Sequence, residues 1–174
     1  MNKISNLIGL PVLALVSGLE VGRVREVVLD YKRAVLCGVI VSEATWFDYV
    51  RGILYEDIVK LGANAISIHD TSVVRDFSKL LDTTGIHALQ ALVGKELYSV
   101  NGNYLGILAD FMVDMPSGCI KLIELSDGLV TDFIYGRTAI PLDAGLAIEQ
   151  ERLVVSEKMY GLVQALNDKS GEVE

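Results

Sequence analysis

The chain is poor in the residues that build metal sites and disulfide frameworks. Its 174 residues include two cysteines, Cys37 and Cys119, and two histidines, His69 and His87. A metal site needs closely spaced Cys or His ligands, and a small secreted scaffold needs many cysteines. These four residues lie far apart in the sequence. We therefore expect two buried free thiols in a reducing, cytoplasmic compartment, and no metal site.

Positive charge and long apolar runs are also scarce. There are 15 Lys and Arg against 23 Asp and Glu, which gives a net charge of −8. Phosphate backbones are bound by clustered Lys and Arg, so we expect no direct contact with nucleic acid. No apolar run reaches the roughly 18 residues that cross a bilayer, so we expect no membrane span. The acidic balance suits a basic protein partner, or serves solubility alone.

The first apolar stretch, LIGLPVLALVSG, imitates a short signal peptide because it follows the charged Lys3. Pro11 interrupts it, however, and LIG at Leu7 to Gly9 recurs as LVG at Leu92 to Gly94, where no signal could lie. We therefore expect this stretch to form a structural strand.

Motifs for catalysis and cofactor binding are missing. The sequence has no G-x-S-x-G, H-E-x-x-H, Walker A or G-x-G-x-x-G pattern. The glycines of GNYLG open an expected strand rather than a helix, which disfavours a phosphate site. The sequence leaves open whether His69 lies next to a nucleophilic side chain in the folded chain. We expect a protein without enzymatic activity, with no catalytic residue and no cofactor.

What the chain does contain is an internal repeat. GLEVGRVREVVLD at 18–30 and GNYLGILADFMVD at 102–114 both have Gly at the first and fifth places and Asp at the last. VLCGVIVSE at 35–43 matches CIKLIELSD at 119–127, and ILYEDI at 53–58 matches AIPLDA at 139–144. A match over most of both halves is a domain duplication, longer than a solenoid unit.

Each copy is typical of short strands joined by tight turns. The spacing of apolar residues slips from period two between Val24 and Val27, and again between Leu108 and Phe111, which predicts a β-bulge that helps a small sheet curl. Asp30 and Asp114 end these strands, and Asp57 and Asp143 follow apolar triplets. We expect Asx turns at these carboxylates rather than a metal or acid–base site.

Two segments are typical of helices. Between the copies, Val73, Val74, Phe77, Leu80 and Leu81 have helical spacing, with Thr71 or Ser72 as the cap and Gly85 beyond the end. After the second copy, the stretch from Met159 to Leu166 has the same spacing. We therefore predict a mainly β chain of two tandem small β-barrels, each followed by a short helix. The predicted parts are a first barrel (1–72), a helical linker (73–91), a second barrel (92–157), and a C-terminal helix with a frayed tail (158–174).

In the order of these motifs the chain resembles the PRC-barrel family. That family includes the cytoplasmic barrel of the photosynthetic reaction-centre H subunit, and a related barrel ends a ribosome maturation factor. The resemblance implies closed or nearly closed sheets of about five or six strands each. It also implies binding rather than catalysis, and a bacterial tandem protein. The chain lacks the membrane segment of the first relative and the N-terminal domain of the second, so photosynthesis is not expected and ribosome maturation is an analogy.

Aromatic residues with arginine supply the candidate partner-binding residues. The stretch TWFDYVRG contains Trp46, Tyr49 and Arg51, and its counterpart TDFIYGRT contains Tyr135 and Arg137. Aromatic and Arg side chains dominate binding hot spots. The alternative is that the rings fill the open end of a barrel.

Three functions compete at this point. The first is a non-enzymatic adaptor that binds a protein partner of unknown identity or another copy of itself, a homo-oligomer. The second is an RNA-processing or ribosome-linked factor that acts through a protein partner. The third is a small-ligand carrier with a pocket at the junction of the barrels.

Overall fold

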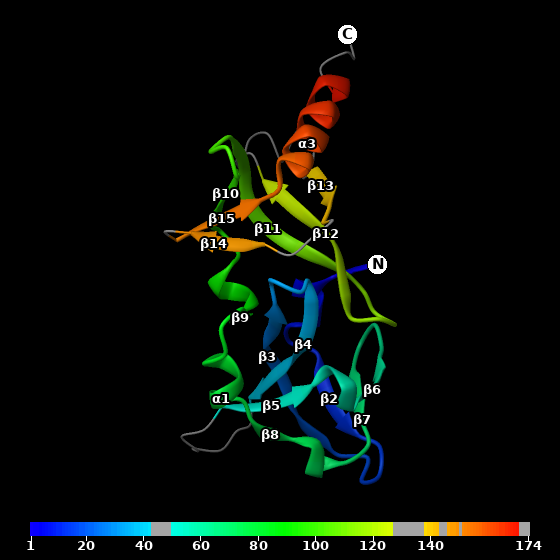
Figure 1. Cartoon of the computed structure of the whole chain (residues 1–174). Helices are drawn as coiled ribbons and strands as arrows, with labels where there is room; N and C mark the ends of the chain where they lie inside the picture. Colours follow the sequence, from blue (N-terminus) through cyan, green and yellow to red (C-terminus); the bar gives the residue numbers. More distant parts are fainter. Residues whose placement is uncertain (43–49, 127–137, 143–145, 150, 171–174) are drawn as a thin grey trace.

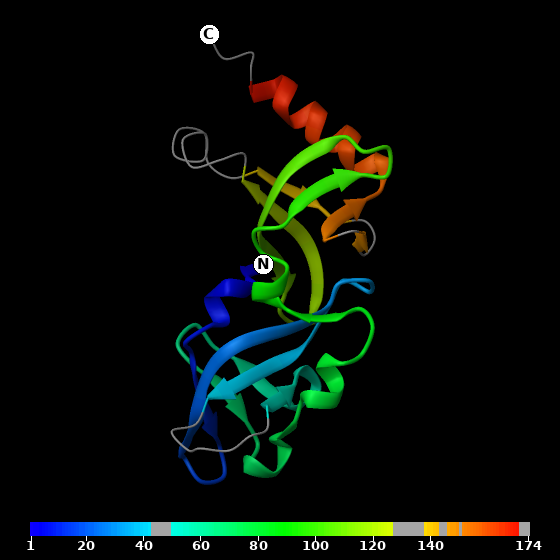
Figure 2. The ribbon, with the colours of Figure 1, turned by 90° about the vertical axis from the view of Figure 1, so that its left-hand side faces the viewer.

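The computed structural model describes residues 1–42, 50–126, 138–142, 146–149 and 151–170. The described chain is mainly β and elongated, with two stacked parts and the N-terminus near the level where they meet (Figure 1). The long strands curve strongly, so that the sheet curls into half-barrels (Figure 2). The predicted β class is therefore confirmed. Two separate closed barrels, and the domain boundaries, stay predictions.

Most strands of the lower part, which we call the first half, come from the first 68 residues. They are β2 (Pro11–Ala14), β3 (Glu20–Asp30), β4 (Val35–Ser42), β5 (Arg51–Leu54), β6 (Ile58–Leu61) and β7 (Ile66–Ile68), with the 3₁₀ turn η2 (Tyr55–Asp57) after β5. In β3 the buried Val24 lies between the exposed Arg23 and Arg25, which share the opposite face. This alternation is why the segment forms a strand with one face on the core.

The upper part, which we call the second half, repeats the same succession. Its strands are β10 (Glu96–Ser99), β11 (Tyr104–Asp114), β12 (Cys119–Ser126), β13 (Thr138–Pro141), β14 (Ala147–Glu149) and β15 (Arg152–Val155). In each half the first strand pairs antiparallel with the second and parallel with the last. In each half the second strand also pairs with the third, and the third with the fourth.

The predicted bulges occur at equivalent places in the two long strands. The register shifts between Val24 and Glu26 in β3, and between Leu108 and Asp110 in β11. The buried Glu26 carboxylate accepts the backbone N–H of Val27 at 2.8 Å, and the buried Asp110 carboxylate accepts that of Phe111 at 2.7 Å. A local acceptor thus satisfies a backbone donor where the ladder is interrupted.

The two halves exchange short strands. β1 (Asn2–Lys3) precedes the first half but pairs with β11, and β9 (Ile86–Ala88) precedes the second half but pairs with β3. Each exchanged strand leads into a 3₁₀ turn, η1 (Ile4–Leu7) or η4 (Leu89–Ala91), whose first residue is buried. The exchange means that each long strand is completed by a segment that belongs, in sequence, to the other half.

The N-terminal segment is anchored through two acidic side chains of the second half. Lys3 Nζ lies 2.7 Å from an oxygen of Glu124, whose side chain is only 9% exposed. The Ser5 backbone N–H donates to Asp110 at 3.3 Å, and the Ser5 hydroxyl donates to the same carboxylate. These contacts fix β1 and η1 against β11, which β1 completes, and against its neighbour β12.

The segment between the halves is only partly helical. It contains η3 (Thr71–Val73), β8 (Arg75–Asp76) and the one-turn helix α1 (Ser78–Leu81) in place of one continuous helix. β8 pairs with β5, and Phe77 N donates to Val50 O at 2.7 Å. The predicted cap, Thr71 or Ser72, is wrong: the N-cap residue of η3 is Asp70, whose side chain accepts the backbone N–H of Ser72. Pairing with β5 therefore overrides the local helical spacing.

The helix predicted after the second half is present as α3 (Glu157–Ser170). Its buried Met159 and Val163 join the main core, which runs through both halves and includes Leu29, Leu108 and Phe111. A small second core groups Val28, Phe77 and Ile86 beside α1.

Candidate interaction surface

Most of the predicted partner-binding residues lie outside the described part of the chain. These are Trp46, Tyr49, Tyr135 and Arg137. Arg51 is described: it begins β5, is partly buried, and is the Cα partner of Asp76 in β8. The five stay candidates, and the structure brings none of them together within the described residues.

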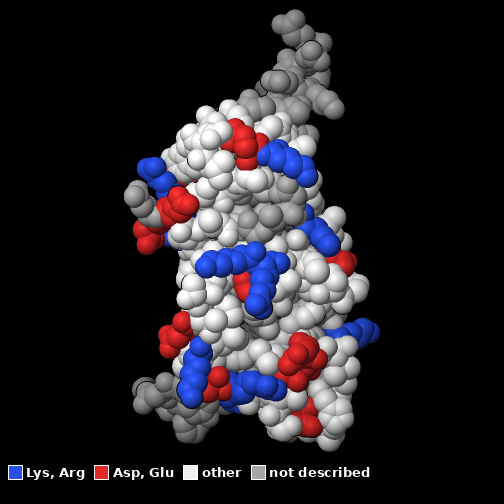
Figure 3. Space-filling view, in the orientation of Figure 1, with Lys and Arg blue, Asp and Glu red and all other residues white. Residues whose placement is uncertain are grey.

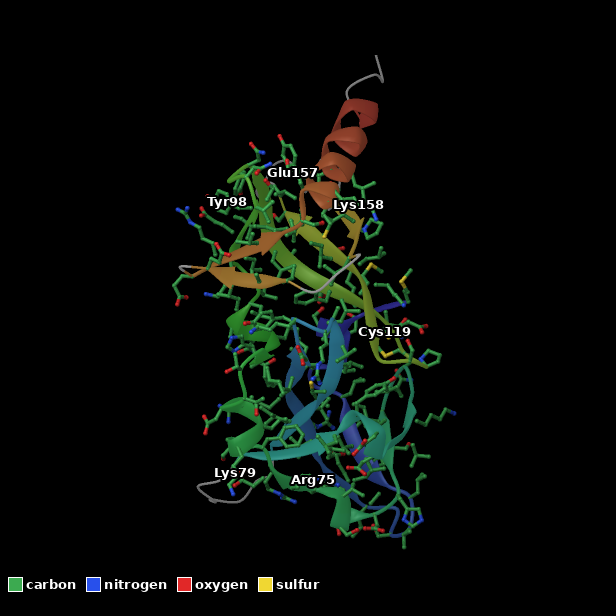
Figure 4. All side chains as sticks on the ribbon, viewed as in Figure 1. Arg75, Lys79, Tyr98, Cys119, Glu157 and Lys158 are labelled. Carbon is green, nitrogen blue, oxygen red and sulfur yellow. The ribbon has the colours of Figure 1, made fainter. Side chains whose placement is uncertain are left out.

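A different aromatic–arginine cluster lies on the outer face of the second half. It surrounds a shallow groove of about 490 Å³. We call it the Tyr98 groove, and it is lined by Tyr98, Ser99, Val100, Gly102, Glu149, Arg152 and Val154. In Figure 4 the label of Tyr98 lies beside β10 and β15, in the part of the molecule that carries α3.

The alternation of the strands places these side chains outside. Leu97 and Val155 point into the core and are almost fully buried, while Tyr98 and Val154, next to them in sequence, are partly exposed. Tyr98 is the Cα partner of Val154 in β15 on one side. On the other side it is the Cα partner of Tyr104 in β11, across the hairpin turn.

The Tyr98 ring is held by three neighbours. The Tyr104 ring meets it edge-on, with centroids 5.5 Å apart and planes at 64°. The guanidinium of Arg152 lies 4.8 Å from its centroid, a cation–π geometry. The Tyr98 hydroxyl hydrogen-bonds to Glu96 at 3.0 Å, and this bond raises the pKa of Tyr98 above its usual value.

Glu96 also lies 3.8 Å from Arg152 Nε, so it links the tyrosine and the arginine. The side chains nonetheless remain accessible: Arg152 is 58% exposed, Tyr104 51% and Val100 64%. The result is an ordered, exposed set of two tyrosines, one arginine and one valine.

The fold itself does not require this cluster. In the first half, the place of Tyr98 in the pairing is held by Leu13, and that of Tyr104 by Glu20. The place of Val154 is held by Ser67. Identical pairing forms there without any aromatic residue. Sequence reasoning missed the cluster because GNYLG was interpreted only as the start of a strand. The available signal was that the first copy has Leu13 and Glu20 where this copy has Tyr98 and Tyr104.

A second hollow lies where β9 meets the second half. It has a volume of about 190 Å³ and is lined by His87, Ala91, Lys95, Ile148 and Glu151. Lys95 Nζ lies 2.7 Å from a Glu151 carboxylate oxygen, and this contact lowers the pKa of Glu151. The His87 ring stacks on Tyr31 of the first half with centroids 5.2 Å apart.

The described residues contain no group of three or more His, Cys, Asp and Glu that could hold a metal ion. Cys37 and Cys119 are free and half-buried, less buried than predicted; Figure 4 labels Cys119 near the level where the halves meet. His69 pairs with its neighbour Asp70 at 2.9 Å on the surface. Within the described part of the chain, no helix is long and apolar enough to cross a membrane.

Basic and acidic side chains of the described residues are interspersed on one face of the molecule. On the face drawn in Figure 3, the described Lys and Arg side chains lie among Asp and Glu and form no single patch. Several are in ion pairs, such as Arg23 with Glu20 at 3.2 Å and Arg75 with Asp57 at 2.7 Å. Asp57, predicted to form a turn, thus pairs with an arginine; Asp143 lies outside the described residues.

Comparison with known proteins identifies the second half. A search of curated proteins finds no match to the chain. Residues 85–158 match the family model of the PRC-barrel domain. This range includes β9 and runs from β10 to β15, and every residue of the Tyr98 groove lies inside it. Residues 85–158 of this chain are therefore a PRC-barrel domain, and the aromatic–arginine cluster is part of its outer surface.

Proposed function

We propose that the chain is a non-enzymatic adaptor whose PRC-barrel domain binds a protein partner through the Tyr98 groove. The observation that carries the proposal is the ordered, exposed Tyr98–Tyr104–Arg152 cluster at positions where the same pairing forms without aromatic residues. PRC-barrel domains are in general protein-interaction modules, which supports the same conclusion.

The chemistry of the groove fits a protein partner. Tyrosine and arginine are enriched among the residues that contribute most to protein–protein binding. Arg152 is held over Tyr98, and the Tyr98 hydroxyl is held by Glu96, so the groups are ordered before a partner arrives. Ordering in advance lowers the entropic cost of binding.

The proposal includes the duplication predicted from the sequence. In this view the two halves are copies of one PRC-like barrel in a cytoplasmic protein, and only the second copy carries the aromatic cluster. The equal pairing order, the equivalent bulges and the reciprocal exchange of β1 and β9 support a common origin. A homo-oligomer is compatible with this function, since the partner can be another copy.

The other two functions lack a specific observation in their favour. Direct RNA contact would need a basic patch, whereas Lys and Arg are interspersed with acidic residues on the face drawn in Figure 3. A ligand carrier would need a junction pocket of at least about 300 Å³. The hollow beside His87 has about 190 Å³.

Site-specific photo-crosslinking in the native cell tests the adaptor function. Val100 and Val16 are exposed valines at equivalent hairpin tips, 64% and 70% exposed. A photoreactive residue at Val100 is expected to give a discrete crosslinked protein that is absent when the same residue replaces Val16. Tyr98→Ala should abolish this product without lowering the amount of folded protein.

Equal products from both valines, or none from Val100, would contradict the proposal. The candidates outside the described residues are tested in the same cells with Trp46→Ala and Tyr135→Ala. Loss of the Val100 product in either variant, with folding retained, would extend the binding surface to the substituted residue.

A further inference from the structure

The geometry of the groove points to its ligand: we infer that it binds an extended, proline-rich segment with basic residues, in the polyproline II conformation. The inference rests on the proposed function and names the class of partner for the same site. It follows from the pairing of the strands that form the floor, from the exposed rings, and from the charge of the rim.

Among the described residues, the two strands directly under Tyr98, β10 and β15, are each paired on both edges. β10 pairs with β11 on one side and with β15 on the other, and β15 pairs with β10 and β14. A ligand lying over Tyr98 therefore cannot add as a strand to β10 or β15. It must be recognised by side chains while its own backbone stays solvated. The polyproline II helix has no internal hydrogen bonds and meets this requirement.

The exposed groups are those that pack against proline rings. Tyr104 and Val100 are more than half exposed, and the flat guanidinium of Arg152 lies over Tyr98. Tyr98 and Tyr104 form an edge-to-face pair rather than a continuous stack. Aromatic-lined shallow grooves of this kind bind polyproline II segments, whose rigidity keeps the entropic cost of binding low.

The charges around the groove favour basic residues beside the prolines. Glu149 lines the groove and Glu96 borders it, and Arg152 is the one basic residue among the described residues of the lining. Arg152 is itself close to Glu96, and the whole chain has a net charge of −8. The two carboxylates outnumber the guanidinium at this described site, and this charge balance favours Lys or Arg in the ligand.

NMR titration of the full chain with synthetic peptides tests the inference. The probe is a peptide with a Pro-x-x-Pro repeat and Arg residues at one end. Its controls replace every Pro by Ala, or every Arg by Glu. We expect the probe to shift the amide signals of Tyr98, Val100, Gly102 and Arg152. We expect both control peptides to bind roughly tenfold more weakly or worse.

Variants distinguish this site from the rest of the surface. Tyr98→Ala and Val100→Ser should each weaken the probe roughly tenfold, while Val16→Ser, at the equivalent tip, should leave its affinity unchanged. Val100 is exposed, so its variant keeps the test valid if Tyr98→Ala fails to fold. Equal binding of the alanine peptide, or shifts confined to other residues, would overturn the inference.

The two proposals fail in different ways. If no proline peptide binds but the Val100 crosslink persists and needs Tyr98, the adaptor function stands and the ligand class is wrong. If neither the peptide nor the crosslink depends on Tyr98, both proposals are wrong.

Discussion

The backbone N–H of Leu36 donates to the carbonyl of Gly118 at 2.8 Å, and the reciprocal bond joins Ile120 to the carbonyl of Ala34 at 2.8 Å. This pair of bonds connects the first residues of β4 and β12, the point at which the two halves become one sheet. Ala34 and Gly118 occupy equivalent turns, and both have a positive φ, 54° and 68°. The halves thus meet about a local pseudo-two-fold relation.

This relation predicts opposite effects of two substitutions. Gly118→Ala should destabilise the chain by about 2–3 kcal/mol, because a Cβ there adds strain at positive φ and would lie 2.7 Å from the ring of Tyr55. Ala34→Gly should stabilise it by up to about 1 kcal/mol, because glycine accepts positive φ without strain. Urea unfolding of both variants measures the two changes. Changes of the same sign would contradict the argument.

The contact of Gly52 with Phe77 gives a second prediction. A Cβ on Gly52 would lie 2.3 Å from Cγ of Phe77, which is 1% exposed. Gly52→Ala should therefore cost about 1–3 kcal/mol of unfolding free energy, but less than about 1 kcal/mol in a chain that already carries Phe77→Ala. A double-mutant cycle in urea measures the difference, with Phe77→Leu as the background if Phe77→Ala does not fold.

The matched control for this cycle is Gly38→Ala. Its Cβ would lie 2.2 Å from the backbone carbonyl oxygen of Ile53, which no side-chain truncation can remove. We expect no relief of its cost by Phe77→Ala. Relief of both glycine variants to the same extent would mean that the contact with the ring is not the cause.

The turn after β3 depends on its aspartate more than the turn after β11 does. The Asp30 carboxylate accepts the backbone N–H groups of Lys32 and Arg33 at 3.0 Å each, and the residue is 8% exposed. Asp114 accepts from the Ser117 hydroxyl instead. Asp30→Ala should lower the unfolding free energy by about 1–3 kcal/mol and Asp114→Ala by less than about 1 kcal/mol. Chemical unfolding of both variants tests the order, and a reversed order would contradict it.

The lowered pKa of Asp70 predicts that the free energy of unfolding depends on pH in the acid range. A hydrogen bond from the Ser72 side chain, followed by that from His69, lowers the pKa of Asp70 from 3.8 to about 2. Because the folded pKa is the lower one, ionised Asp70 stabilises the fold above about pH 4, and this contribution is lost as the pH falls towards 2. Asp70→Asn should remove that part of the acid dependence. In an NMR titration, Ser72→Ala should raise the pKa of Asp70; an unchanged pKa would rule out the assigned cause.

Local features of the structure could be predicted from the sequence because neighbouring residues cause them. The bulges after Val24 and Leu108 follow from a slip in apolar alternation, and the turn at Asp30 follows from a side chain that reaches its own backbone. The C-terminal helix follows from the spacing of Met159 and Val163.

Features that depend on distant partners could not be predicted in this way. The helical spacing from Val73 to Leu81 yields to pairing of Arg75 and Asp76 with β5, a contact that the local pattern does not contain. The Tyr98 groove was missed for a similar reason: Tyr98 and Tyr104 are close in sequence, but Arg152 reaches them only through the parallel pairing of β15 with β10.

The sequence by itself determined the long strands and their bulges, because apolar periodicity and turn chemistry act over a few residues. Tertiary structure alone decided that β1 completes β11 while β9 completes β3, and that one outer face gathers two tyrosines and an arginine. Any free strand edge can accept any extended segment of suitable length. Which segment pairs with which edge therefore depends on contacts between residues far apart in the sequence, such as Lys3 with Glu124 and Ser5 with Asp110.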